Sequence, residues 1–276
     1  MPTLDRPIPV QLRIVLVGTS HPGNIGAAAR AMQTMGLESL HLVAPECDPF
    51  APESQVRAAG AERVMSSMVI HPSLGDALAD CQTVYGCTAR RRSVALPEVT
   101  PRAAAPQLVA AALRGPVALL FGRERTGLEN SELQRCHAAV HIPTDAEFGS
   151  LNLAAAVQVV AYELRLAALA SIESSGSQSV TNTASASIVA AKQAEGSELG
   201  RASDEPPATH AAMERFFEHL EQTLIDIDFH KGRHSTTVMH RLRRLFLRSS
   251  MDAREVRMLR GILAESQRMA RLARPS

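Results

Sequence analysis

A short turn near the amino terminus, PGNIGAAAR, holds the residues whose types and spacing point most directly to chemistry. It follows the apolar run RIVLVG and opens a helix-like stretch, so we predict a strand-to-helix turn. Gly23 and Gly26 allow close backbone approach, Asn24 is a favourable N-cap residue, and the first N–H groups of a helix can bind an anion. Arg30 stands alone beside apolar neighbours, where an arginine usually has an anionic partner. The turn therefore indicates a nucleotide or anion site; the alternative is that Asn24 only caps the helix and Gly26 only packs it on a strand.

Three further loops carry polar residues directly after apolar, strand-like runs: QTVYG leads into CTARRR, PVALLFG into RERTGLENSE, and AAVHIP into TDAEFGSLN. Arg90, Arg91 and Arg92 would bind phosphate, or they form a solvated charge run. Glu124 stands between two arginines, where ion pairing within the loop explains the pattern as well as catalysis does. Ser150 precedes an apolar helix and is either its N-cap or a site residue.

These loops need a sheet that brings them together. Alanine-rich helical stretches, such as residues 103 to 114, alternate with the strand-like runs, so the order is βα. This order predicts an α/β fold with a mostly parallel sheet and helices on both faces. In such sheets, ligands bind outside the carboxyl ends of the strands, where the four loops would gather.

The chain is predicted to have three parts. From 171 to 210 the composition shifts to Ser, Thr, Ala, Gly and Glu, which indicates a flexible linker. Beyond it, apolar residues recur at three- and four-residue steps in three stretches, as in amphipathic helices. We therefore predict an α/β domain over 1–170, a linker over 171–210 and a small all-α domain over 211–276.

The basic charge is concentrated in the last part of the chain. The formal net charge is only +1, yet residues 231–276 contain 12 Lys and Arg against 3 Asp and Glu. Helical spacing puts Arg241, Arg244 and Arg248 on one face, suited to binding RNA phosphates. The residues expected on the opposite, buried face are Val238, Leu242, Leu245 and Phe246. The alternative is a solvated helix paired with acidic residues of its own domain.

Several classes of protein are disfavoured. The four cysteines have no C-x-x-C spacing, and there is neither a signal peptide nor a run of about 18 apolar residues. A reduced cytoplasmic protein without a membrane partner is the simplest interpretation. Among the ten histidines, His137 and His141 lie in a predicted buried strand without a carboxylate or thiol at ligand spacing, so we expect no metal.

In combination and in order, three motifs resemble the SpoU (TrmH-like) branch of the SPOUT RNA ribose 2′-O-methyltransferases. They are PGNIGAAARAM, FGRERTGLENSEL and SLNLAAAVQVVAYE. The resemblance spans roughly residues 10 to 170. The stretches VGTSHPGNIGAAARAMQTMGL, LLFGRERTGLENSELQRCH and the C-terminal HLEQTLIDIDF are similar, within this family, to the enzymes that methylate the ribose of tRNA nucleotide 32, at the start of the anticodon loop.

The resemblance implies a deep trefoil knot in the second half of the α/β domain, a homodimer, and S-adenosylmethionine as the cofactor. It implies a cofactor pocket formed by Cys87, Thr88, Ala89, Gly122, Ile142, Gly149, Ser150, Leu151 and Asn152. It implies catalytic or site-ordering roles for Arg30, Asn24, Glu124 and Ser150. The expected tRNA contacts are Arg90, Arg92, Arg123, Arg241, Arg244 and Arg248.

Two positions depart from the family pattern. Gly18 stands where relatives often carry a polar or acidic residue, and Gly149 stands where a serine is expected. The predicted function is a tRNA ribose 2′-O-methyltransferase. The alternatives are a knotted RNA-binding protein that has lost catalysis and, ranked last because no G-x-G-x-x-G follows the first strand, a nucleotide-binding metabolic enzyme.

Overall fold

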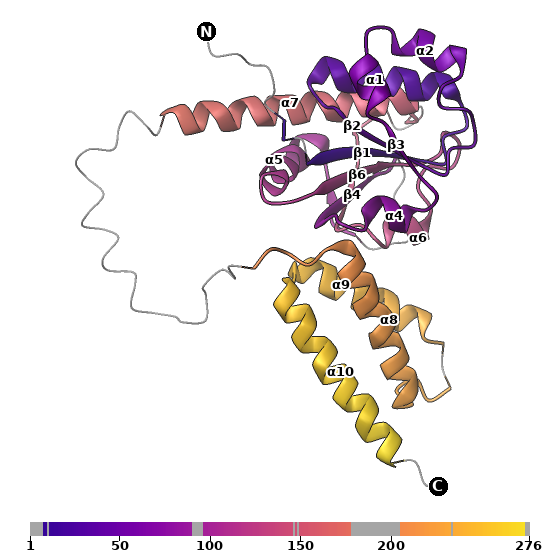
Figure 1. The fold of residues 1–276 in the computed structure, drawn as a ribbon, viewed down its shortest axis with the longest axis vertical. Helices are drawn as coiled ribbons and strands as arrows, with labels where there is room; N and C mark the ends of the chain where they lie inside the picture. Colours follow the sequence, from indigo (N-terminus) through magenta and orange to yellow (C-terminus); the bar gives the residue numbers. More distant parts are fainter. Residues whose placement is uncertain are drawn as a thin grey trace, which may run out of the picture.

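The computed structural model describes residues 8–9, 11–89, 96–145, 147, 149–177, 205–232 and 234–273. Its α/β domain is built on a seven-stranded sheet in the order β3-β2-β1-β6-β4-β7-β5, with every strand pair parallel (Figure 1). The predicted α/β fold is thereby confirmed. The strands are β1 (Leu12–Val17), β2 (Ser39–Val43), β3 (Val69–His71), β4 (Thr83–Cys87), β5 (Glu98–Val99), β6 (Val117–Phe121) and β7 (Ala138–Val140).

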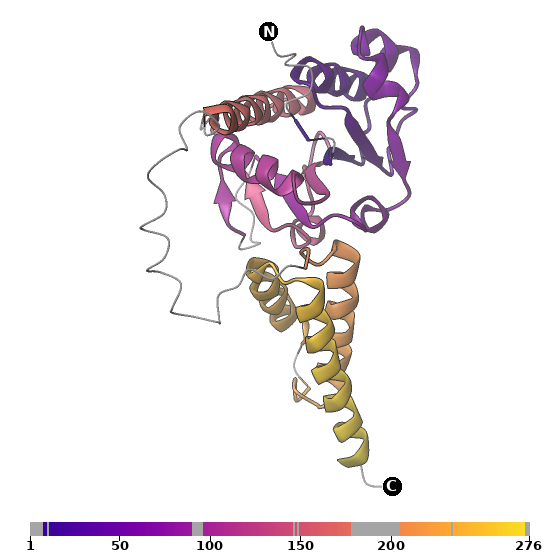
Figure 2. The ribbon, with the colours of Figure 1, turned by 60° about the vertical axis from the view of Figure 1, so that its left-hand side comes forward.

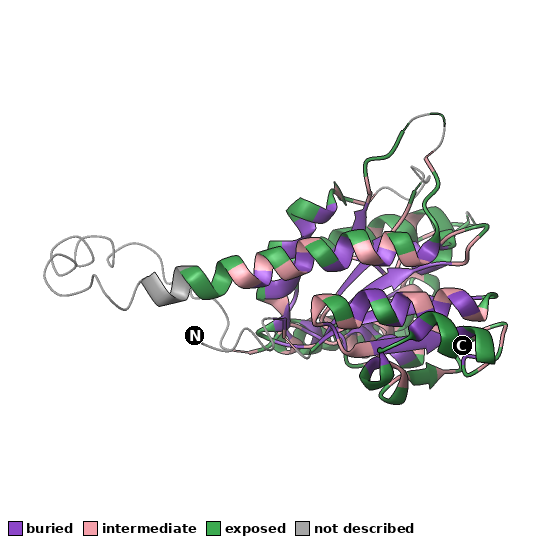
Figure 3. Ribbon diagram, turned by 90° about the horizontal axis from the view of Figure 1, so that it is seen from above, coloured by how far each residue is buried: buried purple, intermediate pink, exposed green. Residues whose placement is uncertain are grey.

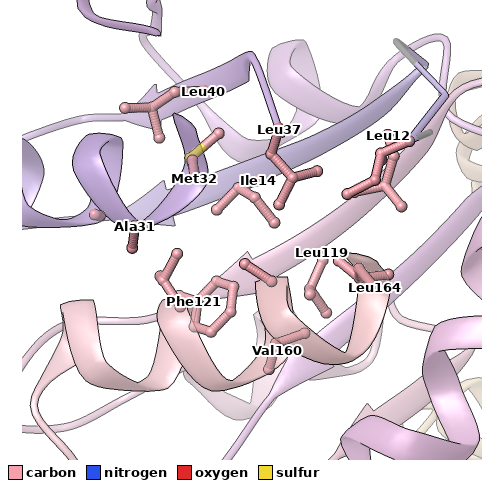
Figure 4. Packing of buried hydrophobic residues seen from close by; sticks show 14 of the residues in the cluster. Leu12, Ile14, Ala31, Met32, Leu37, Leu40, Leu119, Phe121, Val160 and Leu164 are labelled. Atoms are coloured by element: carbon pink, nitrogen blue, oxygen red, sulfur yellow. The ribbon is translucent and has the colours of Figure 1, made fainter. Parts of the chain in front are cut away.

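Helices cover both faces of the sheet, as predicted. Along β1, Ile14 and Leu16 belong to one hydrophobic cluster and Val15 and Val17 to another, because successive side chains of a strand point to opposite faces. The first face carries α1 (Pro22–Met35), α5 (Pro101–Ala112) and α7 (Leu153–Ser177), with α2 (Pro52–Ala58) and α3 (Glu62–Ser66) beside α1. The second carries α4 (Leu74–Leu78) and α6 (Asn130–Leu133). Figure 4 shows the packing on the first face, where sheet residues such as Phe121 meet Met32 of α1 and Val160 of α7.

The first helix starts and ends where its sequence dictates. Pro22 occupies the first turn, and Gly36 ends the helix with φ +81°, a conformation that glycine adopts without strain. A Cβ on Gly26 would lie 1.9 Å from the backbone oxygen of Ser54, so only glycine lets α1 and α2 approach this closely. The alternative that Gly26 packs on a strand is therefore wrong, because its close neighbour is α2.

Helix α7 continues through Ser177, so the predicted linker is wrong for residues 171–177. Alanine and leucine favour the helix up to Ala170, and no proline stops it from continuing into the serine-rich stretch that follows. Residues 153–173 are long and apolar enough to cross a membrane by composition alone. In this fold, however, one side of α7 packs on α1 and α5 and contributes Val157, Val160 and Leu164 to the core.

The three predicted C-terminal helices are present as α8 (His210–Asp226), α9 (Thr236–Ser249) and α10 (Ala253–Ala273). They enclose their own hydrophobic cluster, and α8 and α10 lie side by side, extending away from the α/β domain (Figures 1 and 2). The buried residues of α9 are Met239 and Leu247, whereas Leu245 is 48% exposed. The prediction that Leu245 is buried is wrong because it follows Arg241 by four residues and so shares the arginine face.

Candidate active site

A pocket lies at the carboxyl ends of β4, β6 and β7, beside the first turn of α7. Eight of the nine residues predicted to bind the cofactor line it: Cys87, Thr88, Ala89, Gly122, Ile142, Gly149, Ser150 and Leu151. Three separate loops therefore meet, as the parallel sheet requires. The side chain of Asn152, the ninth, instead reaches Asn24 at the start of α1.

The loop after β6 is a tight turn that forms one wall of this pocket. The Gly127 N–H donates to the Arg123 carbonyl at 2.8 Å, and Gly127 has φ +68°. A Cβ on Gly122 would lie 2.1 Å from the Gly127 carbonyl carbon and 2.2 Å from the Leu128 nitrogen. The turn can therefore close on the end of β6 only because residue 122 has no side chain.

The pocket combines apolar and polar walls. Cys87, Ile142, Leu153 and Ala156 form its apolar part. Burial raises the pKa of the Cys87 thiol to about 12, so the sulfur stays protonated and acts as a small apolar group. Thr144, also in the lining, donates to the Gly149 carbonyl at 3.0 Å and holds the loop before α7 in shape.

Glu124 connects this pocket to the start of α1. Its carboxylate lines the pocket and accepts hydrogen bonds from the Ser20 N–H (3.2 Å), the Ser20 hydroxyl (3.1 Å), the His21 N–H (3.3 Å) and the Asn24 amide (3.0 Å). Burial alone would raise the pKa of Glu124, but the bonds from Asn24 and Ser20 lower it overall. The side chain is therefore an ionised acceptor that orients its neighbours.

The two asparagines extend this network to α7. Asn152 Nδ2 donates to Asn24 Oδ1 at 3.1 Å, while Asn152 Oδ1 accepts from the Ala154 N–H at 2.9 Å. Asn152 thus caps α7, so the alternative that Ser150 is the N-cap is wrong. The N-cap of α1 is His21, so the alternative that Asn24 merely caps this helix is also wrong. Both asparagine side chains serve instead to join α1 and α7 at the pocket.

Arg30 lies two turns beyond Asn24 on the outer side of α1. Its side chain is exposed, and its guanidinium makes no hydrogen bond or ion pair with the part of the chain that the structure describes. The expectation that Arg30 lies away from a solvated surface is therefore wrong, because the apolar side of α1, with Met32, turns to the sheet. The exposed cation is available to a ligand outside this chain.

A family model for the SpoU rRNA methylase family matches residues 11–162, more than half of the chain and all of the elements that build this pocket. The chain belongs to the SpoU methylase family. A second model, for the C-terminal domain of the tRNA methyltransferase TrmJ, matches residues 211–275. The resemblance predicted from the motifs is confirmed.

Curated relatives of this SpoU methylase match it over nearly its whole length. The tRNA (cytidine/uridine/adenosine-2′-O-)-methyltransferase TrmJ of Pseudomonas aeruginosa is 45% identical over 268 residues, covering 95% of each chain. The tRNA (cytidine/uridine-2′-O-)-methyltransferase TrmJ of Salmonella typhimurium is 44% identical and covers 92% of this chain and 95% of its own. The crystal structure of TrmJ from Z. mobilis superposes with a TM-score of 0.71 at 33% identity, covering 92% of this chain and 97% of its own.

Of the predicted RNA contacts in the methylase domain, Arg123 has a structural partner. Its guanidinium lies 3.0 Å from the Glu132 carboxylate and 3.7 Å from that of Glu129. Its side chain also packs against Gly18, where a Cβ would come within 2.8 Å of Nε. The turn after β6 thus directs the Arg123 side chain back onto α6 in this structure, and its assignment to the substrate stays a prediction. Arg90 and Arg92 lie outside the described residues.

The three arginines predicted to share one helix face in the last domain of this SpoU methylase do lie on one exposed face. Arg241, Arg244 and Arg248 are all exposed on α9. The intervening Arg243 instead binds the Glu214 carboxylate at 2.6 and 2.8 Å and lies over the Phe217 ring at 4.4 Å. One arginine of the helix thus stabilises the domain, and three face solvent.

Sequence reasoning missed Ser20 and His21, whose N–H groups fix Glu124, and Thr144, which shapes the last loop. The TSH that precedes Pro22 was a usable signal, because a polar loop at the end of a parallel strand faces the ligand edge. Within the described ranges, three or more His, Cys, Asp or Glu side chains do not gather into a metal-binding group.

Proposed function

We propose that this chain transfers the methyl group of S-adenosylmethionine to the ribose 2′-hydroxyl of nucleotide 32 in tRNA. The observation that carries the proposal is the network joining Glu124, Asn24 and Asn152, which links the pocket to the helix bearing Arg30. The names of relatives 44 to 45% identical over almost the whole chain support tRNA as the substrate and favour an enzyme over an inactive RNA-binding protein.

The pocket suits S-adenosylmethionine chemically. Its apolar side, with Cys87 and Ile142, suits an adenine ring, and the close packing at Gly122 brings the β6 loop into the lining. Glu124 is an ionised carboxylate in the lining and complements a positively charged ligand. When bound, the cofactor supplies an electrophilic methyl group on a sulfonium centre.

The residues of the chain would align the ribose with that methyl group. Glu124 holds Ser20, His21 and Asn24 in place, so the first turn of α1 has a fixed position relative to the pocket. Arg30 projects from the same helix as a permanently charged group, because a guanidinium keeps its proton in proteins. It would bind the phosphate beside the target ribose and stabilise negative charge on the attacking oxygen.

We further propose a homodimer with the trefoil knot of the SPOUT fold. The outer face of α7 carries the apolar residues Val159, Tyr162 and Leu166, which are 37%, 49% and 40% exposed. Figure 3 shows exposed segments recurring along this helix. These residues follow three- and four-residue steps, so they form one stripe on the side of α7 opposite its core residues, and α7 itself packs beside α1. A second copy of the chain would cover this stripe, and Arg30 on the outer side of α1 would then lie near the partner.

Leu166→Glu is expected to convert the dimer to a monomer, because it buries a carboxylate in the apolar stripe. Sedimentation velocity measures the change. Leu113→Glu is the matched control, since Leu113 is 71% exposed and lies outside α7. A wild-type protein that sediments as a fully active monomer would contradict the dimer.

The helical domain would bind tRNA. Deleting residues 205–276 removes α8, α9 and α10 with their separate hydrophobic cluster, so the methylase domain is expected to fold and bind cofactor with affinity within about twofold of wild type. Loss of the exposed arginines should weaken tRNA binding roughly 30-fold at moderate salt. The tRNA affinity of the truncated protein should also fall less steeply as the salt concentration rises. Filter binding of unmodified tRNA measures this. An unchanged tRNA affinity would assign these helices another role.

We place the protein in the cytoplasm. Cys47, Cys81, Cys87 and Cys136 are free thiols, which fits a reducing compartment. A metal-independent reaction fits the proposed transfer, because the sulfonium itself activates the methyl group.

A further inference from the structure

Two clefts separate the helical domain from the methylase domain, and they carry opposite charge. One, here the basic cleft, lies between Pro97 and His137 of the methylase domain and Arg244 and Arg248 of α9, with no carboxylate in its lining. The other, here the acidic cleft, contains Glu205, Asp252 and Glu255 beside Arg114. An anionic ligand would enter the first and be repelled from the second.

The two arginines of the basic cleft are available to a ligand. Both are exposed, and neither guanidinium makes a hydrogen bond or ion pair with any residue that the structure describes. Arg243, which directly precedes Arg244 on the same helix, shows the contrast, since Glu214 neutralises it. Arg244 and Arg248 are one helical turn apart, a spacing at which two guanidinium groups can bind one phosphodiester or two adjacent ones.

The walls of the cleft are held together by the chain itself. At the start of α8, the His210 N–H donates to the Cys81 carbonyl at 2.7 Å and the Ala211 N–H to the Ala79 carbonyl at 3.1 Å. His210 is only 5% exposed at this junction. Two amides that a free helix end would leave unsatisfied are thus paired with the methylase domain, which gives the domains a defined docked position.

The basic cleft lies at the edge of the sheet opposite the cofactor pocket. Pro97 directly precedes β5 and His137 directly precedes β7, whereas the pocket follows the carboxyl ends of β4, β6 and β7. In the sheet register, His137 lies beside Val84, three residues before Cys87 of the pocket, which is about 10 Å along the strand. RNA in the cleft is therefore separated from the pocket by about this distance.

We infer that the basic cleft is a composite phosphate-binding site, formed by both domains, that grips the tRNA backbone at a point remote from the methylated nucleotide. This inference rests on the proposed function. Arg244 and Arg248 supply the charge, and the methylase domain supplies the wall that fixes where the RNA passes. The site contributes to the selection of tRNA and not to the transfer step.

The test compares two double variants of the full chain. Arg244→Gln with Arg248→Gln removes the charge of the cleft. Arg260→Gln with Arg271→Gln removes two exposed arginines of α10 that lie outside it. Filter binding of unmodified tRNA over a salt series should show the cleft variant at least about 10-fold weaker than wild type, with the salt slope smaller by about two units. The control should change less than about threefold.

The kinetics separate binding from catalysis. The KM for tRNA of the cleft variant should rise in step with its Kd, while the single-turnover rate at saturating tRNA falls less than about threefold. Equal tRNA affinities of the two double variants would overturn the inference, as would a loss confined to the saturated rate. If wild-type protein fails to methylate any tRNA, the proposed function itself is wrong.

Hydrogen exchange tests the composite nature of the site. Bound tRNA should slow exchange of the His210 and Ala211 amides at least about threefold, because RNA held between the domains stabilises their docking. Faster exchange of these amides would mean that the helical domain undocks to bind RNA, and would overturn the inference.

Discussion

Arg30→Ala is expected to lower the rate of methyl transfer to tRNA by about 10²- to 10³-fold. The variant removes the exposed positive charge of α1, the helix whose first turn is held by Glu124 through Asn24. The residues that line the pocket stay in place. Single-turnover transfer from labelled S-adenosylmethionine measures the rate, and calorimetry should show cofactor affinity within about twofold of wild type.

A matched control separates this role from general surface charge. Arg57→Ala removes an exposed arginine from the neighbouring helix α2 and should leave the rate within about twofold of wild type. If Arg30→Ala keeps wild-type turnover, or loses cofactor affinity along with the rate, the role given to Arg30 is wrong.

Gly122→Ala is expected to weaken cofactor binding by about 100-fold or more. The added Cβ would overlap the backbone of Gly127 and Leu128, neither of which can rotate away, so the β6 turn must open and move Glu124. Titration calorimetry with S-adenosylmethionine measures the loss.

Gly261→Ala is the control for this substitution, because a Cβ at that position of α10 meets no heavy atom within 4 Å. It should bind cofactor like wild type. A Gly122→Ala protein that is folded by circular dichroism and binds cofactor normally would show that the turn does not shape the pocket.

The central strands were predictable because each is buried on both faces and reads as an apolar run. β2 was not predicted, since His41 interrupts its pattern. In the fold His41 stacks on His71 with a ring separation of 5.0 Å, and burial lowers the pKa of His41 to about 4, so a neutral imidazole occupies the sheet. His71 lies 30 residues after His41, in β3. This strand has only three residues, too few for a recognisable alternation of apolar and polar residues.

The candidate site was predictable from the family resemblance more than from spacing. The resemblance identified eight residues that line one pocket, although they come from three loops far apart in the sequence. It gave no sign of the ion pair between Arg123 and Glu132, because that contact depends on how the loop turns back. Nor could it place the helical domain, whose docking rests on main-chain hydrogen bonds that any residue type can make.

Mapping the methylated atom decides whether this protein is a ribose 2′-O-methyltransferase of tRNA nucleotide 32. Purified protein is incubated with S-adenosylmethionine carrying a labelled methyl group and an unmodified tRNA transcript, and the label is located by nuclease digestion and mass spectrometry. We expect a single label on the ribose of nucleotide 32, and its loss when that nucleotide alone is made 2′-deoxy. Label on a base, label on another nucleotide, or transfer that persists with the deoxy substrate would contradict it.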